Sequence, residues 1–302
     1  STIRVAQLKE LIKAGSVRVI DATYKAAPTM SREDYMKNYY GQFEKSTAEW
    51  VVDDYVKEHI PGAVHFHAEI AAFPGEFEKA SLYPKELFEK YARLLGLNTD
   101  DAVIVYGRGM GAGMLWAARV WWLLKVYGLK NVRVLEGGIE KWKAEGGEVT
   151  STVAKPQPGN FVASGPSDDL KITFDELFPG KPAKLTSPVT LLDARPAGQF
   201  NGTEPLAFPP NGAPGAHVAG SINIPLPTLI TPSSEMKTGD EINALLSSAG
   251  VSTASPTVTM CNGGTQACLL ALALEKAGRP FKVYNGSLRE VSLRAPELIS
   301  EK

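Results

Sequence analysis

The segment VRVIDA at residues 17–22 decides the fold, because it returns in closely similar form as VTLLDA at residues 189–194. Three further segments recur in the same order along both halves: HIPGAV at 59–64 as HVAGSI at 217–222, AVIVYG at 102–107 as TVTMCN at 257–262, and VRVLEGG at 132–138, more loosely, as FKVYNGS at 281–287. The repeat predicts two domains of the same fold, one in each half of the chain.

Each copy alternates short β-branched runs with helical patterns. In the first half we expect helices at 3–14, 84–95, 113–127 and 139–145. This alternation predicts an α/β fold, with a mainly parallel sheet in each domain and helices on both of its faces. A stretch rich in Pro, Gly and Ser separates the copies, so we expect domains at 1–149 and 168–302, joined by a linker at 150–167.

The composition excludes several classes of partner. The formal net charge of −1 over 302 residues offers no field of one sign, so neither nucleic acid nor a membrane surface is expected to bind. The longest apolar stretch is interrupted by Arg119 and Lys125 and is shorter than the ~20 residues that span a bilayer. Two cysteines and four histidines have no compact zinc-ligand spacing, and we expect neither a metal nor a cofactor.

The most informative segment for chemistry is CNGGTQA at 261–267, between an expected strand at 257–260 and an expected helix at 268–276. In α/β sheets ligands bind beyond the carboxyl ends of strands, near helix N-termini. Backbone N–H groups and the helix dipole favour a thiolate and a bound anion there. Cys261 is therefore a candidate nucleophile. The alternative is a buried cysteine that packs as a small apolar residue, which is our expectation for Cys268. The spacing of the two is poor for a disulfide, and so few cysteines suit a reducing compartment.

The loop and the segments around it resemble the two-domain rhodanese and mercaptopyruvate sulfurtransferase family. In that family a cysteine is followed by a glycine-bearing turn with Ala in the seventh place, here Ala267. Six flanking segments are also similar to the family: LDAR at 192–195, FNGTEP at 200–205, GAHVAGSINIP at 215–225, HIPGA at 59–63, RVWW at 119–122 and VLEGGIEKW at 134–142.

The resemblance implies that Cys261 carries sulfur as a persulfide, held by a loop made of Asn262, Gly263, Gly264, Thr265, Gln266 and Ala267. It also implies a small donor of the thiosulfate or mercaptopyruvate class and a thiol acceptor such as thioredoxin or glutathione, or cyanide. The expected compartment is the cytoplasm or the mitochondrial matrix. One alternative is a relay protein that takes persulfide from a protein partner, and another is a structural binding module with an inert Cys261.

Departures from the family leave the substrate open. Related phosphatases have one more loop residue followed by an arginine, whereas this chain has Ala267 and no basic residue in 262–270, so a phosphatase is not expected. The family's loop serine is replaced by Gly263, and one substrate arginine by Gln199. Another arginine position falls within residues 206–208, which contain no base. Neither common donor has its usual cationic contacts.

Three further residues are candidates for substrate binding: Arg195, Gln199 and Arg108. Arg195 can instead form an ion pair with Asp193, and Arg108 can be a solvated arginine. Arg108 belongs to YGRGMGA at 106–112, which occupies the equivalent slot of the first half but has no nucleophile. Its glycines form only a weak dinucleotide fingerprint, without the acidic residue that such sites use.

The four histidines divide into two pairs. His65 and His67 alternate along one expected strand, with Glu69 beyond them, and either reach the site as proton donors or lie at the surface. His59 and His217 occupy matching positions of the repeat, which favours a shared structural role.

Overall fold

The computed structural model describes residues 1–205 and 216–300, and it divides into two compact units. The first unit comprises Ser1–Pro74, Leu82–Ser167 and Pro232–Glu235. The second comprises Gly75–Ser81, Asp168–Thr231 and Met236–Lys302. The positions 206–208, where the family has a substrate arginine, lie outside the described residues.

A five-stranded sheet forms the centre of the first unit, and all of its paired strands run parallel. Its strands lie in the order β1 (Thr2–Ile3), β7 (Asn131–Leu135), β6 (Ala102–Tyr106), β2 (Arg18–Asp21) and β3 (Val64–His65). The expected helices are present as α1 (Val5–Lys13), α5 (Lys85–Leu94), α6 (Leu115–Val126) and α7 (Gly138–Ala144). Shorter elements complete this part: α2 (Arg32–Asn38), α3 (Phe43–Glu49), α4 (Asp53–Lys57), β4 (Ala72–Phe73) and β5 (Ser81–Leu82).

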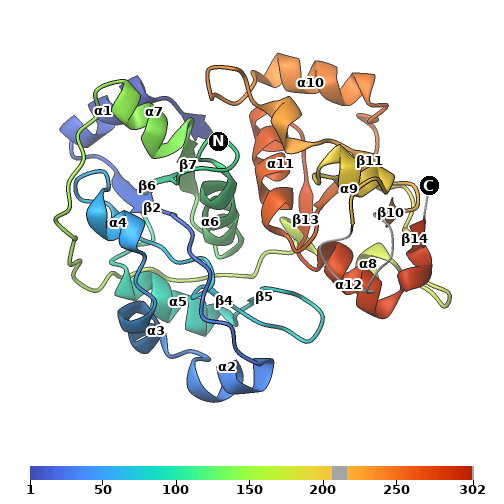
Figure 1. Ribbon diagram of the computed structural model, residues 1–302, viewed down its shortest axis with the longest axis horizontal. Helices are drawn as coiled ribbons and strands as arrows, with labels where there is room; N and C mark the ends of the chain where they lie inside the picture. The colour runs from blue at the N-terminus through green and yellow to red at the C-terminus, as the bar shows by residue number, and fades with distance from the viewer. Residues whose placement is uncertain (206–215, 301–302) are drawn as a thin grey trace. The chain divides into compact units, whose positions relative to one another are not determined.

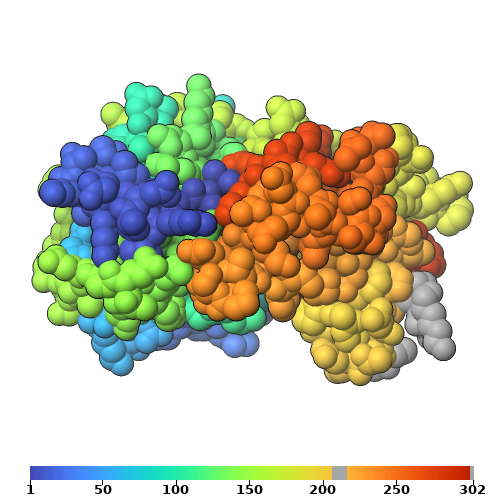
Figure 2. All heavy atoms as spheres, turned by 90° about the horizontal axis from the view of Figure 1, so that it is seen from above, coloured from blue at the N-terminus to red at the C-terminus, as the bar shows by residue number. Residues whose placement is uncertain are grey.

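Helices cover both faces of the first sheet (Figure 1). On one face α1 and α7 lie side by side, as Figures 1 and 2 both show, and Lys9 of α1 donates to the carbonyl of Glu145 just beyond α7. The opposite face carries α5 and α6. Ile104 and Tyr106 of β6 pack with α1 and α7, so alternate residues of this buried strand meet the two helical layers.

The second unit repeats this architecture. Its parallel sheet has the order β8 (Lys171–Ile172), β13 (Lys282–Tyr284), β12 (Thr257–Met260), β9 (Thr190–Asp193) and β11 (Ile222–Asn223), which matches the first sheet strand by strand. The helices are α8 (Phe174–Leu177), α9 (Ala197–Asn201), α10 (Gly239–Ser248), α11 (Thr265–Lys276) and α12 (Ser287–Arg294). The antiparallel strands β10 (His217–Val218) and β14 (Ile299–Ser300) and the 3₁₀ helices η1 (Leu226–Leu229) and η2 (Pro296–Leu298) complete it.

One cluster of the second unit's core lies between its sheet and the pair α8 and α12, and the buried helix α11 packs on β12 and β13. Val258 and Met260 of β12 pack in this cluster with Phe178 and Val291, as Ile104 and Tyr106 of β6 pack on α1 and α7. The tandem α/β fold expected from the repeat is therefore confirmed. Within the described residues, every helix is too short or too polar to cross a bilayer.

Candidate active site

Cys261 follows the central strand β12 directly and lies at the carboxyl edge of the second sheet. Its side chain is buried, with 1% of its surface exposed. Both neighbours of β12 are parallel strands, β9 and β13, so this edge is the place where an α/β sheet presents ligand-binding loops. The expected position of the thiol is the observed one.

The turn after Cys261 brings a backbone donor to the sulfur. Gly264 adopts φ of +100°, a left-handed conformation that favours glycine, and it is the residue before the first turn of α11. Its N–H donates to the Sγ of Cys261 at 3.1 Å. The first N–H groups of a helix have no carbonyl partner within the helix, so the start of α11 adds a positive electrostatic field beside the sulfur.

The helix begins earlier than the sequence suggested. We expected a loop over 261–267 and a helix from Cys268, but α11 begins at Thr265. Gly264 ends the turn, and nothing in Thr265, Gln266 or Ala267 opposes helical geometry once the turn is closed. The loop around the sulfur therefore consists of residues 261–264, and the next three residues form the first helical turn.

The first residues of α12 form hydrogen bonds with the backbone of the loop. Leu288 N–H donates to the carbonyl of Cys261 at 3.0 Å, and Arg289 N–H donates to the carbonyl of Asn262 at 3.0 Å. The N–H of Cys261 donates to the Oγ of Ser287 at 3.1 Å. Ser287 was not singled out in the sequence, although it is the last residue of the repeated segment at 281–287 and lies opposite Gly138.

Cys268 occupies a different environment. It is fully buried on α11, and its Sγ donates to the carbonyl of Gly264 at 3.2 Å. Both cysteines are free thiols. The expectation that Cys268 belongs to the core is confirmed, and its contact supports the turn that carries Cys261.

Two of the three candidate substrate residues lie in the second unit, in different roles. Gln199 on α9 reaches the loop, because its Oε1 accepts from the Nδ2 of Asn262 at 3.0 Å. Arg195 is fully buried, pairs with Asp193 through an Nη2 to Oδ2 distance of 2.7 Å, and donates to the carbonyl of Ala216 at 2.8 Å. The expected ion pair of Arg195 is confirmed.

Uncharged groups line the loop. The Oδ1 of Asn262 and the Oε1 of Gln266 are buried and have no hydrogen-bond partner in the structure. Among the residues that the structure describes, no Lys or Arg side chain donates a hydrogen bond to residues 261–267.

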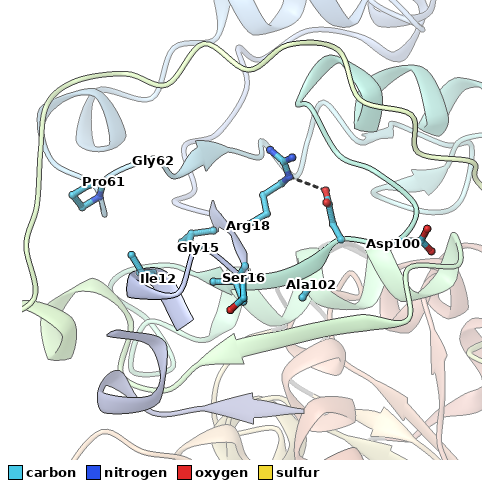
Figure 3. Close-up of a pocket in the computed structure, with 11 residues that line it drawn as sticks. Ile12, Gly15, Ser16, Arg18, Pro61, Gly62, Asp100 and Ala102 are labelled. Carbon is cyan, nitrogen blue, oxygen red and sulfur yellow. Dashed lines mark hydrogen bonds and ion pairs between the residues drawn. The ribbon is translucent and has the colours of Figure 1, made fainter. Parts of the chain in front are cut away.

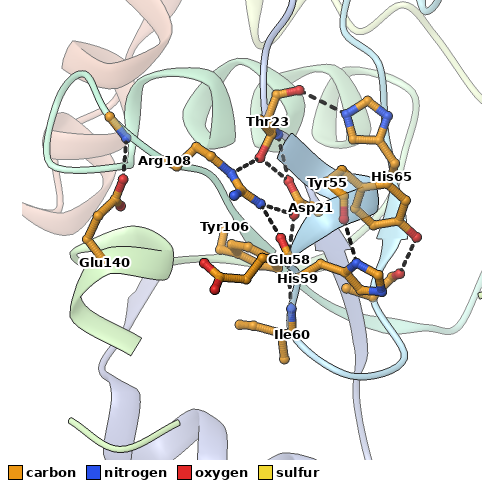
Figure 4. A network of polar contacts seen from close by, with 12 residues as sticks. Asp21, Thr23, Tyr55, Glu58, His59, Ile60, His65, Tyr106, Arg108 and Glu140 are labelled. Carbon is orange, nitrogen blue, oxygen red and sulfur yellow. Dashed lines mark hydrogen bonds and ion pairs between the residues drawn. The ribbon is translucent and has the colours of Figure 1, made fainter. Parts of the chain in front are cut away.

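Arg108 is not a solvated arginine, and this alternative is corrected. Figure 4 shows its guanidinium directed at the end of β2, where it donates to Asp21 at 3.0 Å and to the Oγ1 of Thr23 at 2.6 Å. It also donates to the carbonyl of Glu58 at 2.8 Å. Only 16% of the side chain is exposed. Arg108 is therefore the counterpart of Arg195. Each arginine pairs with the aspartate at the end of the equivalent strand and donates to a backbone carbonyl just before the equivalent histidine.

Hydrogen bonds also correct the alignment of the two copies by one residue. The sequence comparison placed Tyr106 opposite Cys261, but Tyr106 pairs with Asp21 as Met260 pairs with Asp193. Ile139 N–H donates to the carbonyl of Gly107 as Leu288 N–H donates to that of Cys261, both at 3.0 Å. Gly107 therefore occupies the nucleophile's place in the first unit.

The histidines of the first unit are structural. His67 has 3% of its surface exposed and accepts from the N–H of Glu69, and the Nε2 of His65 lies 2.8 Å from the carbonyl of Thr23. Burial lowers the pKa of His67 to about 3 and also lowers the pKa of His65. Both rings are neutral at pH 7, so neither the expectation of a surface histidine nor that of a proton donor holds for His67.

His59 and His217 share the role expected from the repeat. A ring nitrogen of His59 lies 2.6 Å from the carbonyl of Tyr55, and Nδ1 of His217 lies 2.8 Å from the carbonyl of Phe200. Each histidine thus ties its segment to a neighbouring backbone.

The first unit has a hollow of about 460 Å³ (Figure 3). It is lined by residues at the amino ends of β2 and β6, among them Arg18 and Ala102, and Arg18 pairs there with Asp101 at 2.7 Å. The amino ends of strands are the opposite edge from the loops that bind ligands in such sheets. Within the described residues, no group of three or more His, Cys, Asp or Glu side chains can hold a metal.

Comparison with known proteins identifies the class. The sequence model of the rhodanese-like domain matches residues 4–145 and 181–293, which together cover most of the chain. The chain belongs to the rhodanese-like family.

Its relatives in this family are sulfurtransferases. A Caenorhabditis elegans protein assigned as a thiosulfate sulfurtransferase is 37% identical over 304 residues, which cover 97% of this chain and 93% of that protein. The thiosulfate sulfurtransferase of Bos taurus is 32% identical over 299 residues, which cover 96% of this chain and 91% of the bovine protein. This chain is a sulfurtransferase.

Two solved structures agree with this assignment. The 3-mercaptopyruvate sulfurtransferase SseA of Escherichia coli has a TM-score of 0.74 at 27% identity, and the match covers 95% of this chain and 98% of SseA. A sulfur transferase subunit of yeast mitochondrial complex I has a TM-score of 0.77 at 28% identity, covering 100% and 99% of the two chains.

Proposed function

We propose that Cys261 carries the transferred sulfur as a persulfide, between a small sulfur donor and a thiol acceptor. The observation that carries this proposal is the contact of 3.1 Å from the N–H of Gly264 to the Sγ of Cys261, at the N-terminus of α11. A backbone donor and a helix dipole both favour the thiolate, which is the reactive form of a cysteine.

The reaction proceeds by two displacements at sulfur. The Cys261 thiolate attacks the outer sulfur of a donor such as thiosulfate, an S–S bond forms, and sulfite leaves with the electrons of the broken S–S bond. An acceptor thiolate then attacks the outer sulfur of the persulfide, and the electrons of that bond return to Cys261. With thiosulfate as the donor and thiolates as both nucleophiles, neither displacement requires a side chain to move a proton. With mercaptopyruvate as the donor, the C–S bond breaks, and the pyruvate enolate that leaves takes up a proton from water.

The donor belongs to the thiosulfate or mercaptopyruvate class, as in the named relatives. The acceptor is a thiol such as thioredoxin or glutathione, or cyanide in an assay. The likeness to a yeast mitochondrial subunit and the small number of cysteines support the mitochondrial matrix or the cytoplasm as its compartment. The uncharged Gln199 beside the loop supports weak binding of anionic donors.

A second candidate is a relay that takes persulfide from a protein partner. The uncharged loop favours it, because a protein donor needs no cationic contact with a small anion. The test is incubation with thiosulfate, with mercaptopyruvate and with a persulfidated protein, followed by the intact mass. A gain of one sulfur atom from a small donor supports the enzyme, and a gain from the protein alone supports the relay. No gain from any donor would mean that Cys261 is inert.

A further inference from the structure

Ser287 holds an unfavourable backbone conformation beside the candidate nucleophile. Its φ is +51°, in the left-handed region that residues with a β-carbon rarely occupy, and its side chain is fully buried. Strained conformations of this kind persist where surrounding contacts impose them, and they gather at functional sites.

The first unit shows what this position requires structurally. The residue equivalent to Ser287 is Gly138, with φ of +60°, since each precedes the residue whose N–H binds the carbonyl of Cys261 or Gly107. A β-carbon on Gly138 would lie 2.5 Å from the carbonyl of Gly107. The unit without a nucleophile uses glycine here, whereas the unit with Cys261 keeps a strained serine.

The hydroxyl of Ser287 connects the loop to the neighbouring strand. Its Oγ accepts from the N–H of Cys261 at 3.1 Å and donates to the carbonyl of Tyr284, the last residue of β13, at 2.9 Å. The N–H of Cys261 thus points into the protein, and its Sγ meets the N–H of Gly264 on the other side. Both contacts together fix the orientation of the thiol.

We propose that Ser287 is a positioning residue for Cys261, an inference that rests on the proposed role of Cys261 as sulfur carrier. It acts through the main chain of Cys261 and has no contact with the sulfur donor. Without the hydroxyl, the N–H of Cys261 loses its acceptor, the peptide before Cys261 is held only through the carbonyl of Met260, which accepts from Ala194 N–H at 2.9 Å, and the contact from Gly264 to the sulfur loosens. A thiolate that is held less firmly attacks more slowly.

The test compares Ser287→Gly with Ser287→Ala. Glycine relieves the strained φ while removing the hydroxyl, so its melting temperature stays near that of the wild type, whereas alanine keeps the strain and melts lower. We expect iodoacetamide to alkylate Cys261, followed on its own peptide, about tenfold more slowly at pH 7 in both variants. In both variants kcat for sulfur transfer falls with little change in KM.

Ser234→Gly is the matched control. Ser234 is another serine with a left-handed φ, +63°, and it lies outside the loop and α12. Its replacement leaves alkylation of Cys261 unchanged. A wild-type rate of alkylation in a well-folded Ser287→Gly protein overturns the proposal, and so does a collapse of the fold in both Ser287 variants, which would make the role structural. Absence of sulfur uptake in the wild type, together with slower alkylation in the Ser287 variants, would refute only the proposed function.

Discussion

Replacement of Gln199 by arginine tests whether the site lacks a cationic contact for its donor. The resemblance to the family implies an arginine that binds substrate at the place of Gln199, and in this structure Gln199 contacts the loop through Asn262 at 3.0 Å. An arginine on the same short helix, α9, brings its guanidinium to the same side of the loop. We therefore expect Gln199→Arg to lower KM for thiosulfate.

Two opposing free-energy contributions set the size of the expected change in kcat/KM. A charge-assisted hydrogen bond to an anion contributes about 1.5–3 kcal/mol. The variant also loses the hydrogen bond between Gln199 and Asn262, which costs about 1 kcal/mol. The net gain of about 0.5–2 kcal/mol corresponds to roughly 2- to 30-fold in kcat/KM.

The assay is steady-state transfer from thiosulfate to cyanide, with a thermal melt to exclude loss of fold. Gln157→Arg adds the same charge at an exposed position in the first unit and should leave KM unchanged. Gln199→Met removes the hydrogen bond without adding charge and should not lower KM. The reasoning is refuted if the wild type already has a low KM for thiosulfate, or if Gln199→Arg behaves like Gln157→Arg.

Two further predictions concern the first unit. Arg108→Met leaves the fully buried Asp21 without its counter-ion, so we expect the free energy of unfolding, measured in urea, to fall by about 3 kcal/mol. The control Arg18→Met breaks the more exposed pair with Asp101 and should lower the free energy of unfolding by less than about 1 kcal/mol. Sulfur transfer per folded molecule should be unchanged, because the Arg108 guanidinium is already occupied; a selective loss of activity would instead make Arg108 a substrate ligand. The pKa of His67, lowered by burial to about 3, lies below the value of about 6.5 expected in the unfolded chain, so the unfolded state binds more protons between these values. The free energy of unfolding is therefore highest above about pH 6.5 and falls below it, by up to about 1.4 kcal/mol per pH unit from this group, and His67→Gln should flatten the fall between about pH 6 and 4. An unchanged slope in that variant would show that His67 is not the group responsible.

The repeat made most of the fold predictable. Runs such as 17–22 and 189–194 combine β-branched residues with a shared Asp-Ala ending, and each forms an interior strand of its sheet, β2 or β9. The edge strands β1 and β8 contain two residues each and carry too little pattern to be recognised. Their pairing with β7 and β13 depends on contacts across the sheet, which local sequence does not encode.

The wrong predictions of strand register and of side-chain partners also arise because local sequence does not encode contacts across the fold. An apolar strand such as β6 is buried on both faces, so its side chains do not define its register to one residue, and Tyr106 was placed opposite Cys261. The partners of Arg108 are Asp21 and Thr23, which lie 87 and 85 residues away along the chain. Ser287 carried no signal of its own, because its importance comes from a backbone conformation that the sequence does not show.

The most direct test of the central claim is the location of the transferred sulfur. The protein is incubated with the donor that gives uptake, or with a persulfidated small thiol, and its peptides are mapped by mass. We predict one added sulfur on the peptide of Cys261 in the wild type and in Cys268→Ser, where the buried hydroxyl lowers only the melting temperature. Cys261→Ser should melt like the wild type and gain none, because an alcohol forms no stable persulfide. Sulfur on Cys268, or uptake retained in Cys261→Ser, would contradict the assignment.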